Sequence, residues 1–311
     1  MSHFAEDGRV PGTLQCDVAS RAREPFTKPR PNLGNMSGFP IRALHLLLLR
    51  SIHMTILNTS DEIMSASKIR ILCLHGFTSN GQVHAHQLRR ITKALPEYDF
   101  IFPDGPHQVD IASQMDMTTP ANEAWSEMVN AISTSGHRAW WFAREGNWAN
   151  KETGGFHGLE QSLDFIGKYI QENGPVHSIW GFSQGACFAG MLSALLQDKL
   201  SNHPLRKHLP SQLLAPKTSV IFSGFRARFP QYDGIYEPQI DIPILHVMGE
   251  KDSIVRGERS DQLVEVCPNS EILKHAGGHD IPKSDQDQKQ IAEFLRRHLP
   301  SSDSGYAQPS I

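Results

Sequence analysis

The sequence of 311 residues has few cysteines and no excess of charge of one sign. No Cys-x-x-Cys pair is present, which excludes zinc-finger spacing and favours a reduced, intracellular protein. Lys and Arg total 30 and Asp and Glu total 33, so the net charge of −3 provides no global positive field for nucleic acid or an anionic membrane. The four cysteines are Cys16, Cys73, Cys187 and Cys267, of which the second and third fall in apolar stretches and are predicted to be buried.

The chain also lacks an apolar run long enough to cross a membrane. Its most apolar segment, residues 41–57, is interrupted by two arginines and two histidines. A spanning helix needs about 20 largely uncharged residues, and this run starts too late for an ordinary signal peptide. We therefore expect no transmembrane segment.

Residues 1–66 are predicted to form a disordered extension, because their first 40 residues are rich in Pro, Gly, Ser and Arg and show no helical or strand period. Residues 41–57 could add a packing or membrane-touching helix. An organelle-targeting leader is an alternative, although the acidic residues of the segment argue against it. A start codon assigned too far upstream is another, with Met54 or Met64 as the true start. We expect a cytoplasmic location and a disordered tail over 301–311.

From Ser67 onward, short apolar runs alternate with amphipathic segments, which predicts an α/β fold with a mostly parallel sheet and helices on both faces. One catalytic domain over 67–300 is expected, with a loop-rich insertion at about 106–155. The predicted strands are 69–74, 99–102, 176–180, 219–222, 244–247 and 271–274. The predicted helices are 82–95, 159–172, 184–200, 256–266 and 285–299.

The junction between strand 176–180 and the following helix carries Gly181-Phe182-Ser183-Gln184-Gly185, which matches Gly-x-Ser-x-Gly in a strand–turn–helix context. Such a turn strains the serine backbone, and side chains at the flanking positions would collide with it. It also exposes the hydroxyl at the amino end of a helix, whose dipole favours developing negative charge. We predict that Ser183 is a nucleophile.

A serine nucleophile needs a base and an acid that orients the base. Asp252 follows strand 244–247, and His279 lies in a glycine-containing loop after strand 271–274. The order Ser, Asp, His is that of the α/β-hydrolases. Glu250 or Asp280 is an alternative acid and His275 an alternative base, although its position at the strand end favours a packed core residue.

An acyl-transfer site also needs amide donors for the oxyanion. We expect the N–H of Gln184, directly after the nucleophile, and the N–H of Phe77, in the loop after strand 69–74. His84 and His86 suggest a metal site, but residues two apart point to different faces of a helix and no acidic ligand is suitably spaced. We expect no metal and no cofactor.

The predicted insertion contains four of the five tryptophans and is long for a connection in a compact domain, which is typical of a lid. Its aromatic side chains could wall an apolar acyl pocket or pack the insertion onto the core. The candidates for substrate binding are Trp140, Trp141 and Trp148, with Phe225 as a further candidate outside the insertion.

Together these motifs resemble the FSH family of serine hydrolases. The resemblance covers about residues 68–299 and rests on ILCLHGFTSNG (71–81), RAWWF (138–142), GPVHSIWGFSQGA (174–186), Ser223-Gly224-Phe225, residues 249–254 and Gly277-Gly278-His279. It implies an α/β-hydrolase fold with Ser183, Asp252 and His279 as the triad. The Ser-Ile-Val-Arg stretch after Asp252 departs from the family, which usually has a proline there.

The resemblance implies a serine hydrolase that cleaves carboxyl esters or thioesters through an acyl-enzyme. Since several fungal members release or trim polyketides, it also implies a role in secondary metabolism, with an acyl carrier domain of a polyketide synthase as a partner. Nucleic acid is not an expected partner. An acyltransferase with the same triad is the main alternative, and a non-catalytic binding protein is the other.

Overall fold

The computed structural model describes residues 69–145 and 154–300. The chain divides into two units, Met1–Ile63 and Met64–Ile311, and all described residues belong to the second. The predicted extension, the apolar run 41–57, the tail 301–311, Cys16 and Trp148 lie outside the described residues.

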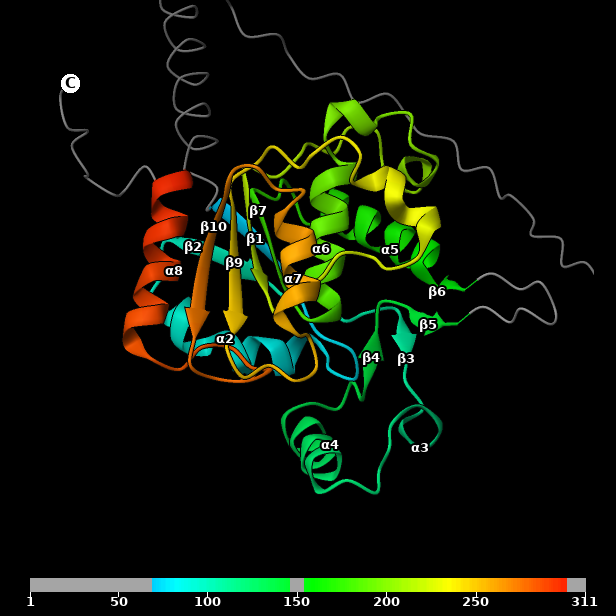
Figure 1. Cartoon of the computed structure of the whole chain (residues 1–311), viewed down its shortest axis with the longest axis vertical. Coiled ribbons are helices and arrows are strands. Elements are labelled where there is room, and N and C mark those ends of the chain that lie inside the picture. The colour runs from blue at the N-terminus through cyan, green and yellow to red at the C-terminus, as the bar shows by residue number, and fades with distance from the viewer. Residues whose placement is uncertain (1–68, 146–153, 301–311) are drawn as a thin grey trace, which may run out of the picture. The chain divides into compact units, whose positions relative to one another are not determined.

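The core of the fold is a six-stranded sheet in the order β10-β9-β8-β7-β1-β2, in which every neighbouring pair is parallel (Figure 1). This is the predicted α/β-hydrolase fold. The strands are β1 (Ile69–Leu74), β2 (Tyr98–Ile101), β7 (Ser178–Phe182), β8 (Thr218–Phe222), β9 (Ile244–Gly249) and β10 (Ser270–His275). The main helices are α2 (Gly81–Lys93), α5 (Leu159–Glu172), α6 (Gln184–Leu195), α7 (Gly257–Val264) and α8 (Asp285–His298).

Alternate side chains of each strand enter two different cores, because successive residues of a strand face opposite sides of the sheet. In β1, Ile71 and Cys73 pack on the side covered by α2 and α8, whereas Leu72 and Leu74 pack on the side covered by α5 and α6. Helix α6 is buried along its whole length. Its first turn, which follows Ser183, is therefore held rigidly against the sheet.

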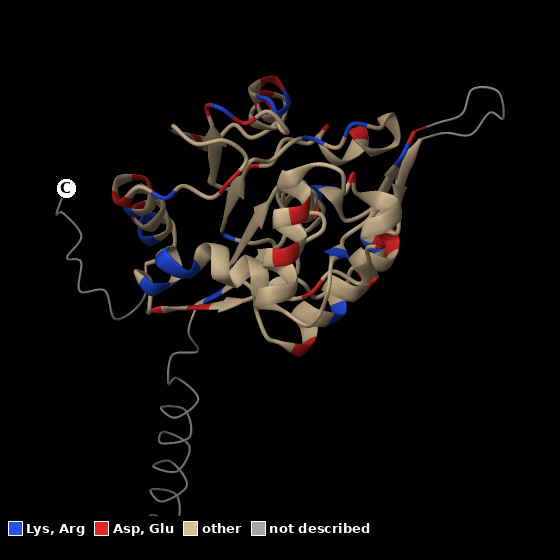
Figure 2. Ribbon diagram, turned by 90° about the horizontal axis from the view of Figure 1, so that it is seen from below, with Lys and Arg blue, Asp and Glu red and all other residues tan. Residues whose placement is uncertain are grey.

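The parallel strands end together at one edge of the sheet, drawn at the bottom of Figure 1 and facing the viewer in Figure 2. We call it the carboxyl edge, and we call the opposite edge, where the strands begin, the amino edge. Ligands of open α/β sheets bind outside the carboxyl ends of the strands. The loops after β1, β7, β8, β9 and β10 are therefore the ones that position a site.

The segment predicted as a loop-rich insertion contains more regular structure than expected. It includes helix α4 (Pro120–Ile132) and the short helix α3 (Ile111–Gln114). Strand β3 (His107–Gln108) pairs with β4 (Arg138–Ala139), and β5 (Phe142–Arg144) pairs with β6 (Gly155–His157). Its lid function stays a prediction, because residues 146–153 lie outside the described residues.

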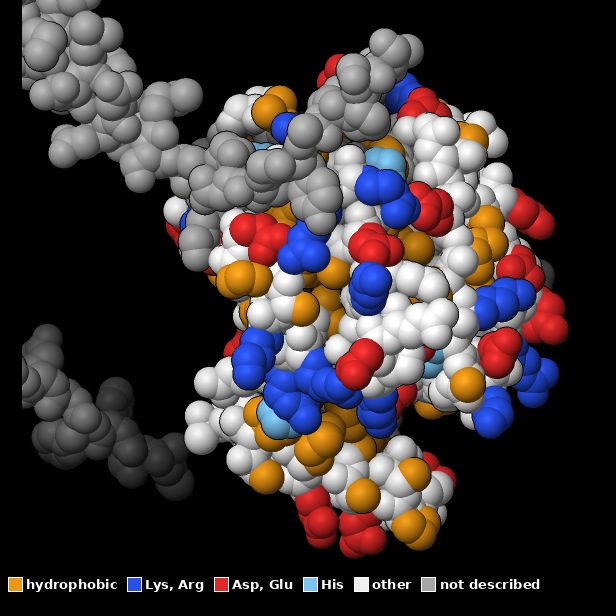
Figure 3. Space-filling view, turned by 90° about the vertical axis from the view of Figure 1, so that its left-hand side faces the viewer, with side chains coloured by type: hydrophobic (Ala, Val, Ile, Leu, Met, Phe, Trp, Pro, Cys, Tyr) orange, Lys and Arg blue, Asp and Glu red, His pale blue; other side chains and the backbone are white. Residues whose placement is uncertain are grey.

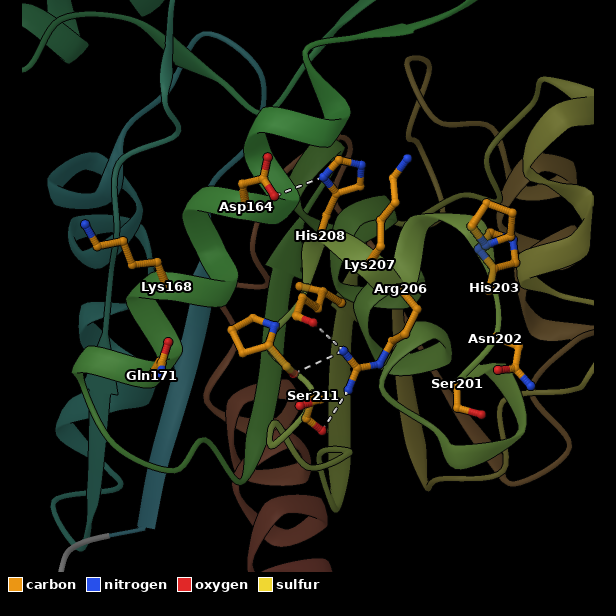
Figure 4. Close-up of a pocket in the computed structure, with 13 residues that line it drawn as sticks. Asp164, Lys168, Gln171, Ser201, Asn202, His203, Arg206, Lys207, His208 and Ser211 are labelled. Carbon is orange, nitrogen blue, oxygen red and sulfur yellow. Dashed lines mark hydrogen bonds and ion pairs between the residues drawn. The ribbon is translucent and has the colours of Figure 1, made fainter.

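A cavity of about 800 Å³, to which mainly charged and polar residues contribute, opens at the amino edge between α5 and residues 201–211 (Figure 4). Arg206 points toward the end of the segment 201–211, where its guanidinium donates to the carbonyls of Leu209 and Pro210 at 2.7 and 3.1 Å. His208 faces Asp164 of α5, with 2.9 Å between Nδ1 and Oδ1. These contacts close the loop onto α5, and none of the residues predicted for the chemistry lines this cavity.

Basic and acidic side chains lie beside one another over much of the face seen in Figure 3. This mixture agrees with the small net charge of the sequence. Within residues 69–145 and 154–300, none of the helices combines the length and the apolar character that crossing a membrane requires.

Candidate active site

Ser183 lies at a sharp turn between β7 and α6. Its backbone has φ 53° and ψ −113°, a conformation that is rare outside glycine. A Cβ atom on Gly181 would lie 2.2 Å from the Gly185 carbonyl oxygen, and one on Gly185 would lie 2.1 Å from the Leu74 carbonyl oxygen. The two glycines are therefore required by the close approach of backbone to backbone, and they allow Ser183 to stand at the carboxyl edge.

Asp252 and His279 meet beside this turn, from the loops after β9 and β10. The His279 Nδ1 atom lies 2.8 Å from Asp252 Oδ2. The other carboxylate oxygen accepts the N–H groups of Ile254 and Val255 at 2.9 and 2.8 Å. The Asp252 carboxylate is therefore held by three donors, and its side chain is only 2% exposed.

The protonation of Asp252 follows from these contacts. Burial alone would raise the pKa of this carboxyl, but the hydrogen bonds from His279 and from the Val255 N–H outweigh it and lower the pKa below its ordinary value. The carboxylate is therefore ionised at neutral pH and accepts the proton on His279 Nδ1. This fixes the tautomer of the ring and leaves Nε2 as its other nitrogen.

The His279 ring packs against Phe182, the residue before the serine, with ring centroids 4.8 Å apart. The described residues show no hydrogen bond between His279 and the Ser183 hydroxyl. Contacts of this kind are often loose in a free enzyme and tighten only when substrate is bound. The contact with Phe182 nevertheless places the ring next to the turn that carries Ser183.

The loop after β1 presents the Phe77 amide near this turn. Neither the Phe77 nor the Gln184 N–H has a hydrogen-bond partner among the described residues. The insertion supports the loop from outside, since Trp125 Nε1 donates to Thr78 Oγ1 at 3.0 Å and Asn80 Nδ2 donates to the Gly136 carbonyl at 2.9 Å. Thr78 itself has a positive φ of 62°.

His75 holds the peptide that carries the Phe77 amide. Its Nε2 accepts the Gly105 N–H at 2.8 Å, so Nδ1 carries the proton and donates to the Gly76 carbonyl at 2.7 Å. In a trans peptide the carbonyl and the following N–H point in opposite directions. The hydrogen bond to Gly76 therefore directs the Phe77 N–H away from His75. Burial lowers the pKa of His75 to about 4, so the ring is neutral at pH 7.

Trp140 and Trp141 are 0% and 2% exposed and lie in the apolar core around Phe188 of α6. The Trp140 indole N–H donates to the His75 carbonyl at 2.9 Å. These contacts favour the packing alternative for both tryptophans over a role as open pocket walls. Phe225, by contrast, is half-buried beside the site. Trp148 lies outside the described residues.

The side chain of Gln184 has a role that the sequence analysis missed. Its Oε1 accepts the Trp140 N–H and its Nε2 donates to the Trp141 carbonyl, both at 2.9 Å. This pair of hydrogen bonds ties the insertion to the first residue of α6. No local sequence signal predicts it, because the partners are more than 40 residues apart.

Ser223 is a second feature missed from sequence. It follows β8 with a positive φ of 47°, and its buried side chain lies close enough to the Asp252 carboxylate to contribute to lowering the pKa of that group. The Ser-Gly pair after a buried strand was the available signal.

Among the described residues, neither Glu250 nor Asp280 forms an ion pair with His279, and Asp280 pairs with Lys283 instead. His275 is 5% exposed at the end of β10, as expected of a packed core residue. His84 is fully buried in α2 whereas His86 is exposed, so the two point to different faces as predicted. No group of three potential metal ligands occurs within the described ranges.

The sequence is similar to a known enzyme family and to several curated proteins. The family model for serine hydrolases (FSH1) matches residues 64–291. The relatives include the Danio rerio protein "Esterase OVCA2", which is 31% identical over 240 residues, covering 75% of this chain and 99% of that protein. "Esterase CG5412" of Drosophila melanogaster is 29% identical over 242 residues, covering 75% of each chain.

A Schizosaccharomyces pombe protein named "Dihydrofolate reductase" is 33% identical over 236 residues, covering 73% of this chain. The chain spans 47% of the length of that relative. Among solved structures, Arabidopsis thaliana SOBER1 aligns with a TM-score of 0.47 and 18% identity, over 74% of this chain and 98% of that one. The chain belongs to the FSH1 family of serine hydrolases and is an ester-cleaving hydrolase.

Proposed function

We propose that Ser183, His279 and Asp252 are the catalytic triad of this hydrolase and that Ser183 forms an acyl-enzyme with its substrate. The main support is the 2.8 Å contact between His279 Nδ1 and Asp252 Oδ2, beside the strained turn that carries Ser183. A base oriented by a buried carboxylate next to a strained serine is the arrangement that activates a serine hydroxyl.

Proton transfer follows from the tautomer of His279. Because Nδ1 donates to Asp252, Nε2 is the atom that takes the proton from Ser183 Oγ as this oxygen attacks the acyl carbonyl. The protonated ring then gives the proton to the leaving alcohol or thiol. A water molecule attacks the acyl-enzyme with the same ring as base, which releases the acid and restores Ser183.

The Phe77 and Gln184 amides stabilise the oxyanion in this proposal. Both N–H groups lack partners among the described residues, and the Gln184 amide also lies at the positive end of the α6 dipole. His75 and the Gln184 side chain act as positioning residues, since they fix the peptides that carry these amides.

The finer proposals concern substrate and location. We propose carboxyl esters or thioesters as substrates, and, from the family resemblance alone, polyketide release with an acyl carrier domain as partner. Hydrolysis of acyl thioesters by the purified protein tests this directly. A cytoplasmic location is supported by the buried, unpaired state of Cys73, Cys187 and Cys267, and microscopy of the tagged protein tests it.

Replacing the nucleophile tests the triad. Ser183→Ala should lower kcat/KM for p-nitrophenyl butyrate by roughly 10³-fold to 10⁶-fold, because the acyl-enzyme cannot form. Ser193→Ala is the matched control. It removes a hydroxyl from the same helix, where Ser193 contacts Ser219 at 2.8 Å, and should leave the rate within a few-fold. Near-wild-type turnover by pure Ser183→Ala protein would contradict the proposal.

A further inference from the structure

Arg259, in the first turn of α7, is a cation near the triad without an acidic partner. Its guanidinium carbon lies 4.3 Å from the centroid of the Phe225 ring. Two arginines that follow Phe225 in sequence differ in this respect, since Arg226 pairs with Asp233 at 2.8 Å and Arg228 pairs with Glu145. Across the described residues, no carboxylate forms an ion pair with Arg259.

Contacts around Gly224 connect Arg259 to the nucleophile. The hydroxyl of Ser260, the next residue in α7, donates to the Gly224 carbonyl at 2.7 Å. A Cβ atom on Gly224 would lie 3.3 Å from the Cβ of Ala186. The Ala186 N–H in turn donates to the Ser183 carbonyl at 3.0 Å. The start of α7, the residue before Phe225 and the turn at Ser183 are therefore packed against one another, which places Arg259 on an element held next to the nucleophile.

The electrostatic surroundings leave Arg259 in need of a counter-charge. Burial and the nearby positive charge of Arg228 lower its pKa, while the negative charge of Asp252 raises it. An arginine remains charged at neutral pH in any such setting. The Asp252 carboxylate is already bound by His279 and two amides, so it is not available as a direct partner. A half-buried cation without a carboxylate favours binding of an anion.

The contact with Phe225 is compatible with such a role. The guanidinium carbon lies over the ring, and a cation–π contact of this kind does not use the N–H groups at the edge of the guanidinium, which can still donate. A carboxylate or phosphate accepts two parallel hydrogen bonds from that edge.

We propose that Arg259 binds an anionic oxygen group of the ester or thioester substrate. The group is either a carboxylate at the far end of the acyl chain or a phosphate on the leaving group. This inference rests on the proposed function, because it assumes that Ser183 attacks the scissile carbonyl. It makes Phe225 the apolar support of the binding group.

Four substrates of equal acyl length test the inference. Neutral p-nitrophenyl pentanoate is compared with the mono-p-nitrophenyl ester of glutaric acid, which adds a carboxylate to the acyl chain. The pentanoyl thioester of pantetheine is compared with that of 4′-phosphopantetheine, which adds a phosphate to the leaving group. Wild type is assayed beside Arg259→Met, and beside Arg256→Met as the control, since Arg256 is exposed at the start of the same helix.

For one anionic substrate, Arg259→Met should lower kcat/KM about ten- to a hundredfold, the usual range for a charge-assisted hydrogen bond. The kcat/KM of Arg259→Met for the matched neutral substrate should stay within a few-fold of the wild-type value. Arg256→Met should leave kcat/KM unchanged for both substrates. A selective loss on the charged p-nitrophenyl ester identifies the bound group as the carboxylate of the acyl chain. A selective loss on the charged thioester identifies it as the phosphate of the leaving group. Equal effects of Arg259→Met on the charged and neutral members of both pairs would overturn the inference.

A measurement on wild type avoids dependence on the folding of the variant. Glutarate should inhibit hydrolysis of the neutral ester competitively and more strongly than pentanoate if the acyl chain carries the anion. If the leaving group carries the anion, 4′-phosphopantetheine should inhibit competitively and more strongly than pantetheine. Absence of both effects would overturn the inference, whereas failure of wild type to cleave any neutral ester would instead contradict the proposed function.

Discussion

The two edges of the sheet differ in where their backbone is strained. Among the described residues, the non-glycine residues with positive φ are Thr78, Ser183 and Ser223, which follow β1, β7 and β8 at the carboxyl edge. At the amino edge, the loop before β7 reaches a φ of +80° at Gly174, where a glycine adopts it without steric cost. Among the described residues, positive φ at a non-glycine residue is thus confined to the carboxyl edge.

The two edges also differ in whether particular polar groups have hydrogen-bond partners. At the amino edge, the Arg206 guanidinium donates to carbonyls of its own loop and contributes to closing it. At the carboxyl edge, the amides of Phe77 and Gln184 have no partner among the described residues. At the amino edge Arg206 is therefore satisfied by its own loop, whereas the carboxyl edge leaves these two amide donors available for a substrate.

The largest effect is expected from Asp252→Asn at the carboxyl edge. The amide oxygen can still accept the Ile254 and Val255 N–H groups, but its NH₂ group would face His279 Nδ1 and favour the wrong tautomer. By analogy with the corresponding change in another serine hydrolase, kcat should fall by roughly 10⁴-fold. Steady-state kinetics measures this, and circular dichroism should show an unchanged fold. Retention of full activity would remove Asp252 from the triad.

The close approach at Gly185 is tested by a pair of substitutions in one helix. Gly185→Ala places a Cβ atom 2.1 Å from the Leu74 carbonyl oxygen and should lower the free energy of unfolding by about 3 kcal/mol. In Gly190→Ala the new atom would lie 3.6 Å from Leu263, so helix propensity should raise stability by up to about 1 kcal/mol. Urea titrations compare the two, and similar stabilities would contradict this explanation of Gly185.

The buried His75 should make stability depend on pH. Its pKa is about 4 in the folded state and about 6.5 in an unfolded chain, so the unfolded state binds more protons between these values. The stabilisation is complete above pH 6.5 and is lost as the pH falls toward 4, by about 3 kcal/mol.

The variant His75→Gln should therefore flatten the dependence of unfolding free energy on pH between 7 and 4.5. The pKa of His177, at the amino edge, is also lowered, chiefly by burial, but this ring is partly exposed, so His177→Gln should flatten the dependence less. Urea unfolding at several pH values separates the two. If His177→Gln flattened the pH dependence more than His75→Gln, His75 would not be the main source of that dependence.

The smallest effect is expected at the amino edge from Gly174→Ala. A side chain at φ +80° should lower the free energy of unfolding by about 1 kcal/mol. Because the loop is remote from Ser183, kcat/KM for esters should not change. A loss of activity without a loss of stability would show that the two edges are coupled.

The central fold could be predicted from sequence because its strands are short, apolar and regularly spaced. Strand 69–74 matches the observed β1, and the other predicted strands end within two residues of the observed ends. The predicted helix 184–200 is too long, since α6 ends at Leu195 and a 3₁₀ turn follows. Helix α4 was missed although Thr119 and Pro120 form a typical helix start.

Local motifs identified the residues that meet at the carboxyl edge, since strand ends converge there. The contacts of Gln184 with Trp140 and Trp141, and the absence of an ion pair at Arg259, depend on distant segments and could not be predicted. The sequence also could not decide between pocket wall and core for the tryptophans, because both are apolar environments. Their burial follows from packing against Phe188 of α6.

The most direct test of the proposed triad is labelling of the full-length protein with a fluorophosphonate, followed by mass mapping of the adduct. Ser183→Ala is labelled in parallel. The account predicts an adduct confined to Ser183 in wild type and none in the variant, because only an activated serine reacts. Labelling of another serine, or equal labelling of both proteins, would contradict the assignment of Ser183 as the nucleophile.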